Sequence, residues 1–108
     1  MPTYIIVQIQ IHDRPAFRQY MEAARPIVEQ HGGTYLVRGR VTDVLEGDGE
    51  PLVAGVIEFD TREAALAFYE SAEYRPLREL RAQATTSSLV LVSDDPPPAG
   101  AVDSSTPK

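Results

Sequence analysis

The sequence lacks cysteine and tryptophan, and its two histidines, His12 and His31, lie far apart. Without cysteine the chain has no disulfides, no thiolate metal ligands and no cysteine nucleophile. The two histidines do not have the spacing of a metal site, and there is neither a phosphate-binding loop nor a dinucleotide-binding glycine pattern. We therefore expect neither a metal ion nor a cofactor.

Positive charge is scarce as well, because 10 Lys and Arg residues stand against 16 Asp and Glu residues, for a net charge of -6. Nucleic acids and anionic membranes attract clustered basic side chains, so we expect neither as a partner. No apolar run approaches the roughly 20 residues of a membrane-spanning helix. The N-terminal MPTYIIVQIQI lacks the basic start and the cleavage site of a signal peptide. We expect a soluble protein of the cytoplasm.

The apolar residues that are present follow patterns of strands and helices. Residues 3–11 alternate cleanly, which predicts a strand with Ile5, Val7, Ile9 and Ile11 on one face. The other predicted elements are a helix from Asp13, its cap, to about Gln30, strands over 34–46, 52–59 and 88–92, a helix after Asp60 or Thr61, and a short helix over 74–82.

Three short features mark the ends and bends of these elements. Gly32 or Gly33 is expected to end the first helix in the left-handed conformation. Asp60 and Glu63 have the spacing of a capping box, and Gly39 is the expected site of a bend or bulge in the second strand.

The element order β-α-β-β-α-β predicts an α+β fold, the ferredoxin-like plait. Its antiparallel sheet has the spatial order 4-1-3-2, with both crossover helices on one face. Residues 1–93 form the expected domain. Residues 94–108 are rich in Pro and Ser and have little to bury, so we expect a flexible tail.

The sheet face that the helices leave bare is predicted to be mixed in character. Its side chains are expected to be Tyr4, Ile6, Gln8 and Gln10, then Leu36 and Arg38, then Leu52, Ala54, Val56 and Glu58. A second copy of the same sheet would bury such an apolar patch, so we expect a homodimer through the sheet faces. Arg38 and Glu58 are predicted to face each other between the two sheets. They either line a ligand pocket or only neutralise each other.

The segment FYESAEYRPLRELR concentrates aromatic and cationic side chains. Tyr74, Arg78 and Arg81 recur at helical spacing, so one helix face presents a phenol and two guanidiniums. This face either orients an anionic or carbonyl-bearing ligand, or consists of core tyrosines and solvated arginines. His12, at the end of the first strand, is either a base or a turn residue.

These patterns define two sets of candidate residues. The candidate catalytic residues are Arg38, Glu58, Tyr69, Tyr74 and His12. The candidate ligand-binding residues are Tyr4, Gln8, Leu36, Arg38, Ser71, Arg78 and Arg81.

The stretches GGTYLVRGR, VLEG, VIEFDTREAALAFYESAEYRPLRELR and LVLV resemble the domain-of-unknown-function 1330 family of the dimeric α/β barrel superfamily. The resemblance covers residues 4–92 and implies a ferredoxin-like protomer that dimerises through its sheet. It implies no activity. Relatives in the superfamily include heme-degrading and quinone-forming monooxygenases, lactone isomerases and polyketide cyclases. Arg40 stands where the family often has glycine.

Two classes of function stay open. Tyr, Arg, Glu and His side chains can polarise a carbonyl and move a proton, which suits a cofactor-independent isomerase, cyclase, lyase or monooxygenase-like enzyme. The alternative is a non-catalytic ligand-binding module or a purely structural dimer. A cavity on which Arg38 and a tyrosine converge would favour a ligand site, and a filled interior would favour the structural dimer.

Overall fold

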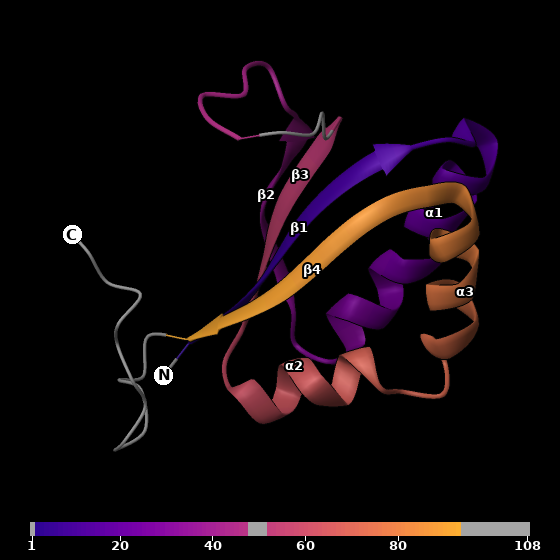
Figure 1. Ribbon diagram of the computed structural model, residues 1–108. Helices are drawn as coiled ribbons and strands as arrows, with labels where there is room; N and C mark the ends of the chain where they lie inside the picture. Colours follow the sequence, from indigo (N-terminus) through magenta and orange to yellow (C-terminus); the bar gives the residue numbers. More distant parts are fainter. Residues whose placement is uncertain (1, 48–51, 94–108) are drawn as a thin grey trace.

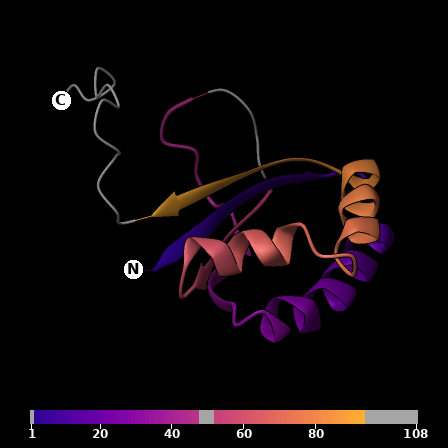
Figure 2. The same cartoon turned by 90° about the horizontal axis from the view of Figure 1, so that it is seen from below.

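The computed structural model describes residues 2–47 and 52–93, which form a four-stranded antiparallel sheet and three helices. In chain order the elements are β1 (Thr3–Ile11), α1 (Arg14–Gln30), β2 (Thr34–Arg40), β3 (Val53–Phe59), α2 (Arg62–Tyr69), α3 (Arg75–Ala84) and β4 (Thr85–Ser93). The helices lie on one face of the sheet and leave the other bare (Figures 1 and 2). The expected tail, 94–108, lies outside the described residues.

The strand order β2-β3-β1-β4 is the predicted order 4-1-3-2 read from the opposite edge. All three pairings, β1 with β3, β1 with β4 and β2 with β3, are antiparallel. The predicted ferredoxin-like plait is therefore confirmed. No helix in the described part of the chain is long and apolar enough to span a membrane.

The helix ends follow local side-chain chemistry. Asp13 caps α1, because its Oδ1 accepts a hydrogen bond from the Ala16 amide at 3.1 Å. Gly32 follows the helix with a φ of +81°, the left-handed conformation expected there. Thr61 caps α2 through its hydroxyl. The predicted capping box with Glu63 is wrong, because a cap at Thr61 places Glu63 one position too early.

The core lies between the helices and the covered face of the sheet. Phe59 of β3, Phe68 of α2 and Tyr74 before α3 are almost fully buried. The rings of Phe68 and Tyr74 have centroids 4.4 Å apart, and those of Phe59 and Phe68 are 5.6 Å apart. Ile5 and Ile57 are buried beside them, as their alternation predicts.

Strand β2 departs from strict alternation. Its pairing with β3 shifts between Tyr35 and Val37, so the bulge lies at Leu36 and not at Gly39 as predicted. A bulge adds one residue to one strand, and every residue beyond it changes face. β2 also ends at Arg40, well before the expected end at residue 46.

The bulge corrects the prediction for Arg38. Arg38 lies opposite Gly55, and Gly55 lies opposite Val7, which belongs to the helix-covered face. Glu58 lies opposite Thr34, at the other end of β2. The predicted Arg38–Glu58 pair on the open face is therefore wrong, because alternation counted through the bulge is off by one residue.

Candidate functional site

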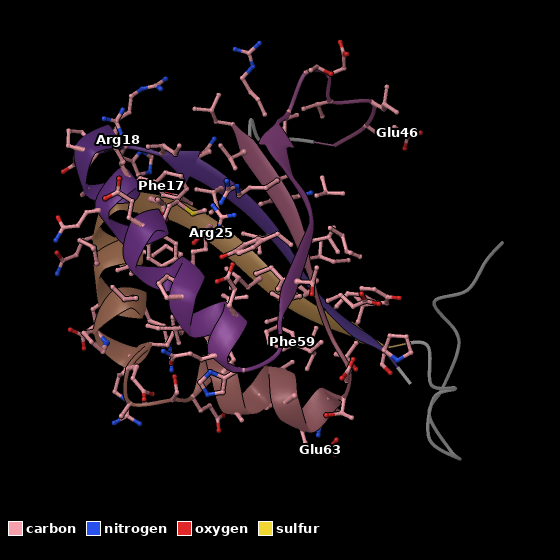
Figure 3. All side chains as sticks on the ribbon, turned by 180° about the vertical axis from the view of Figure 1, so that it is seen from behind. Phe17, Arg18, Arg25, Glu46, Phe59 and Glu63 are labelled. Carbon is pink, nitrogen blue, oxygen red and sulfur yellow. The ribbon has the colours of Figure 1, made fainter. Side chains whose placement is uncertain are left out.

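A cleft of about 610 Å³ lies between α1 and the edge of the sheet formed by β2 and β3. Its lining residues are Phe17, Arg18, Met21, Glu22 and Arg25 from α1, and Arg38, Gly39 and Val53 from the sheet. Figure 3 views the molecule from the side of α1, with Phe17, Arg18 and Arg25 labelled along the helix. We call this space the α1 cleft.

A smaller cavity of about 50 Å³ adjoins the α1 cleft and shares Phe17, Met21, Arg38 and Val53 with it. Its remaining walls are Val7, Ile9, Tyr20, Tyr35, Ala54, Gly55 and Ile57. Gly55, in the wall of this inner cavity, lies where the β2 backbone approaches closely. Among the described atoms, a Cβ at Gly55 would contact only the backbone of β2, and its nearest neighbour would be Val37 O at 3.1 Å.

The α1 cleft combines a cationic wall with an apolar floor. Arg18, Arg25 and Arg38 stand against a single lining carboxylate, that of Glu22. The Arg38 guanidinium lies 5.4 Å from the centroid of the Tyr35 ring, a cation–π contact that helps to hold it over the cleft. Such walls suit a small molecule with an apolar body and a negative charge.

Arg25 also has a partner outside the cleft. Its Nε lies 3.5 Å from a carboxylate oxygen of Glu29, and both side chains are more than half exposed. Exposed pairs of this kind contribute roughly 0–1 kcal/mol. The pair therefore leaves Arg25 available to a ligand at little cost.

Two buried tyrosines meet behind the inner cavity. The hydroxyls of Tyr20 and Tyr74 are 2.6 Å apart in a hydrogen bond that either can donate. Burial raises the pKa of Tyr20 well above its ordinary value of 10.0, and Tyr74 adds to the rise while Arg81 opposes it. Burial likewise raises the pKa of Tyr74, against opposing effects of the hydrogen bond with Tyr20 and of Arg81.

Tyr35, on the floor of the inner cavity, also stays protonated near neutral pH. Burial raises its pKa, and the positive charge of Arg38 works against that rise. Protonated phenols can donate hydrogen bonds to a carbonyl or an oxyanion, but they do not remove protons at neutral pH. Tyr35 therefore offers a donor at the inner end of the cleft, whereas the Tyr20 hydroxyl is engaged with Tyr74.

The predicted helix face of Tyr74, Arg78 and Arg81 is only partly assembled, because Tyr74 is buried in the core and does not line the cavity that holds the two arginines. Tyr69, Arg78 and Arg81 line a cavity of about 370 Å³ beside α3, and the Arg78 guanidinium lies 4.2 Å from the Tyr69 ring centroid. Ser71 serves the turn between α2 and α3, because its hydroxyl donates to Phe68 O at 2.9 Å and accepts from the Tyr74 amide at 3.2 Å. These hydrogen bonds account for Ser71 as a residue of the turn.

The remaining candidates lie away from both cavities. Tyr4 pairs with Glu58 and Gln8 with Ala54 on the open face, and Leu36 is half exposed at the bulge. His12 is exposed at the end of β1, where its Nε2 lies 2.7 Å from Thr86 Oγ1. This contact supports the interpretation of His12 as a turn residue.

Sequence reasoning missed most of the α1 cleft. Arg18, Met21, Glu22 and Arg25 recur at i, i+3, i+4 and i+7, so they share one helix face, and this spacing was a usable signal. Tyr20 carried no signal, because a tyrosine in an apolar stripe is typical of a core position. Within residues 2–47 and 52–93, no group of three or more His, Asp or Glu side chains could hold a metal ion.

Comparison with solved structures finds the same fold in several proteins. A protein of unknown function from Rhodopseudomonas palustris has a TM-score of 0.74 and 19% identity over 89% of this chain and 84% of its own. A dimeric ferredoxin-like protein of unknown function from Jannaschia sp. CCS1 has a TM-score of 0.65 and 14% identity, covering 86% and 99%.

A third similar structure is SnoaB, a cofactor-independent oxygenase from Streptomyces nogalater. Its TM-score is 0.65, with 10% identity over 89% of this chain and 95% of its own. At these identities the likeness shows the fold alone. Among curated proteins, none matches the chain.

The family comparison covers nearly the whole folded region. Residues 2–94 match the model of the family described as domain of unknown function (DUF1330). The match agrees with the sequence resemblance, and the similar structures agree with the ferredoxin-like architecture. The chain belongs to the DUF1330 family.

Proposed function

We propose that this protein is a homodimer that binds a small organic anion in the α1 cleft and acts on it without a cofactor. The observation that carries the proposal is the arrangement of Arg18, Arg25 and Arg38 around an apolar floor that leads to two protonated tyrosines. Anionic or carbonyl-bearing ligands with an aromatic or aliphatic body fit these walls best.

Binding draws on both kinds of wall. A volume of about 610 Å³ lies in the range of ordinary small-molecule sites. The guanidinium of Arg38 can hold a carboxylate or an enolate oxygen through paired N–H donors. Phe17 and Met21 offer apolar surface to the rest of the ligand.

Catalysis would rest on stabilising negative charge. Arg38 and the Tyr35 hydroxyl could share the charge of an enolate or a phenolate, which suits isomerisation, cyclisation, lyase chemistry or cofactor-free oxygenation of an activated aromatic. The likeness to a cofactor-independent oxygenase supports this class only as an analogy of fold.

A specific observation favours the second candidate, non-catalytic binding. The only carboxylate that lines the α1 cleft among the described residues is Glu22, and no histidine lines it. Because the tyrosines stay protonated, Glu22 is the one group at hand to accept a proton. Loss of turnover but not of binding in Glu22→Gln would identify an enzyme.

The proposed dimer rests on one row of side chains across the open face. Val37 pairs with Val56, Val56 with Ile6, and Ile6 with Val90, so the row crosses all four strands. Val37 and Val90 are 56% and 53% exposed, which is a large apolar surface to leave in water. A second sheet would cover this apolar row isologously.

The test of the ligand class compares 1-naphthoate with its neutral amide by calorimetry. We expect the carboxylate to bind about 10-fold more tightly, because a guanidinium pair with a carboxylate is worth about 1.4 kcal/mol or more. Arg38→Met should abolish that preference while the protein stays folded by thermal melting. Arg62→Met is the matched control, since Arg62 is exposed at the start of α2 and lines neither the cleft nor the inner cavity.

Equal binding of the two compounds by the wild-type protein would contradict the proposal. So would an equal loss in the Arg38 and Arg62 variants, because that result would indicate general attraction by positive charge.

A further inference from the structure

A second pair of cavities lies near the end of α2, one beside α3 and one between α2 and strands β1 and β4. Figure 2 shows how the end of α2 leads to α3. The cavity of about 370 Å³ is lined by Tyr69, Arg75, Arg78, Glu79 and Arg81. An apolar slot of about 240 Å³ is lined by Ile5, Ala65, Leu66, Tyr69, Leu89, Val90 and Leu91. Tyr69 is a wall of both, so a basic cavity and an apolar slot adjoin at one ring.

One arginine of the basic cavity, Arg81, is buried without a hydrogen-bonded counter-charge among the described residues. It is only 8% exposed, and its Nε and Nη1 are buried without a hydrogen-bond acceptor in the described part of the chain. A buried cation without a counter-charge is strongly unfavourable. The nearby hydroxyls of Tyr20 and Tyr74 bond to each other and carry no charge.

The net charge of the residues that line the basic cavity indicates the charge of the ligand that would fit it. Three guanidiniums, those of Arg75, Arg78 and Arg81, stand against the single carboxylate of Glu79. The excess of two positive charges matches a doubly charged oxyanion. Arginine is the side chain that best fits the oxygens of a phosphate, because its N–H groups form a planar fork.

The apolar slot indicates that the anion carries an organic group. Arg78 stacks over Tyr69 at 4.2 Å, so the same ring that holds this guanidinium also forms a wall of the slot. A phosphate held by the arginines can therefore place its substituent beside Tyr69, against Leu66 and Leu89.

We propose that the cavity beside α3 binds a phosphate monoester whose apolar group lies in the slot next to Tyr69. This site is separate from the α1 cleft, because the two sets of lining residues have no member in common. The hydrogen-bonded pair of Tyr20 and Tyr74 lies between them: Tyr20 lines the inner cavity of the α1 cleft, and the charge of Arg81 acts on both hydroxyls.

The experiment measures binding of phenyl phosphate and of inorganic phosphate to the full chain by calorimetry at low ionic strength. We expect saturable binding of phenyl phosphate, about 10-fold tighter than inorganic phosphate because the ring gains apolar contacts in the slot. Arg78→Gln should weaken phenyl phosphate binding about 10-fold or more. Arg62→Gln removes the same charge from an exposed site outside the cavity and should leave binding unchanged.

Arg38→Met separates this proposal from the function proposed for the α1 cleft. Phenyl phosphate binding should survive this substitution, since Arg38 lines only the α1 cleft and its inner cavity. Loss of binding in Arg38→Met would overturn the proposal, because the ligand would then lie in the α1 cleft. Equal weakening by the Arg78 and Arg62 variants, or no saturable binding, would overturn it as well.

Discussion

The helix-covered face and the open face of the sheet differ in the side chains that they carry. The covered face holds the aromatic core, and Arg38 of β2 lines the inner cavity beside it, while Arg81 of α3 lines the cavity between α2 and α3. The open face carries the apolar row that begins at Val37 and ends at Val90. The contrast teaches that most of the candidate ligand chemistry lies on the helix side of the sheet and the candidate assembly surface on the open side, with Val90 shared because it also lines the apolar slot.

The largest expected effect comes from placing a charge in the apolar row. Val90→Asp would put a carboxylate at the proposed interface, and we expect the dimer dissociation constant to rise about 100-fold or more. Sedimentation equilibrium at micromolar concentration measures it. Leu45→Asp is the control, because Leu45 is 92% exposed and lies outside the sheet. A wild-type monomer, or a Val90→Asp dimer of unchanged affinity, would show that the open face is not the interface.

Adding one methyl group in the core and another on the open face should cost very different amounts of stability. A Cβ at Gly33 would lie 2.6 Å from Val28 Cγ1 and 2.8 Å from Phe59 Cζ, within the tightly packed core. We expect Gly33→Ala to lower the free energy of unfolding by about 1–3 kcal/mol. On the open face a Cβ at Gly39 meets no described atom within 4 Å, so Gly39→Ala should cost little. Urea unfolding of both variants measures the difference, and equal losses would contradict it.

The third prediction concerns alkaline pH and the tyrosines of the covered face. The folded state holds Tyr20 protonated above its ordinary pKa of 10.0, whereas the unfolded chain releases that proton. Below pH 10 the tyrosine is protonated in both states and does not change the free energy of unfolding. Above pH 10 the free energy of unfolding falls by about 1.4 kcal/mol per pH unit for each such tyrosine. Urea unfolding at matched protein concentration measures the slope.

Tyr20→Phe should flatten that slope by about 1.4 kcal/mol per pH unit. It should also lower stability at neutral pH by roughly 1–3 kcal/mol, because the Tyr74 hydroxyl loses its partner. The chain has no cysteine and no tryptophan, so tyrosinate absorbance reports the titration without interference from either. An unchanged alkaline slope in this variant would show that Tyr20 does not stay protonated in the folded protein.

Much of the architecture could be predicted because it follows from local patterns. Alternation predicted β1 with its bounds, Asp13 predicted the start of α1, and a glycine predicted its end. The element order then led to the strand order through the small number of topologies that such an order permits. The shared cavity of Arg78 and Arg81 could be predicted from their helical spacing, but the phenol beside them is that of Tyr69 and not of Tyr74.

The position of Arg38 could not be predicted in the same way. A bulge at Leu36 depends on how β2 and β3 pair across the sheet, and neither strand's own sequence shows it. The contact of Tyr20 with Tyr74 joins residues 54 positions apart through the packing of α1 on α3.

Periodicity along the chain thus determined the helices, the strands and the face that each residue takes in a regular element. Only the tertiary structure decided the faces beyond the bulge and the cavities between elements. The physical reason is that hydrogen-bond register and side-chain packing are set by distant segments, whose contacts leave no period in the sequence.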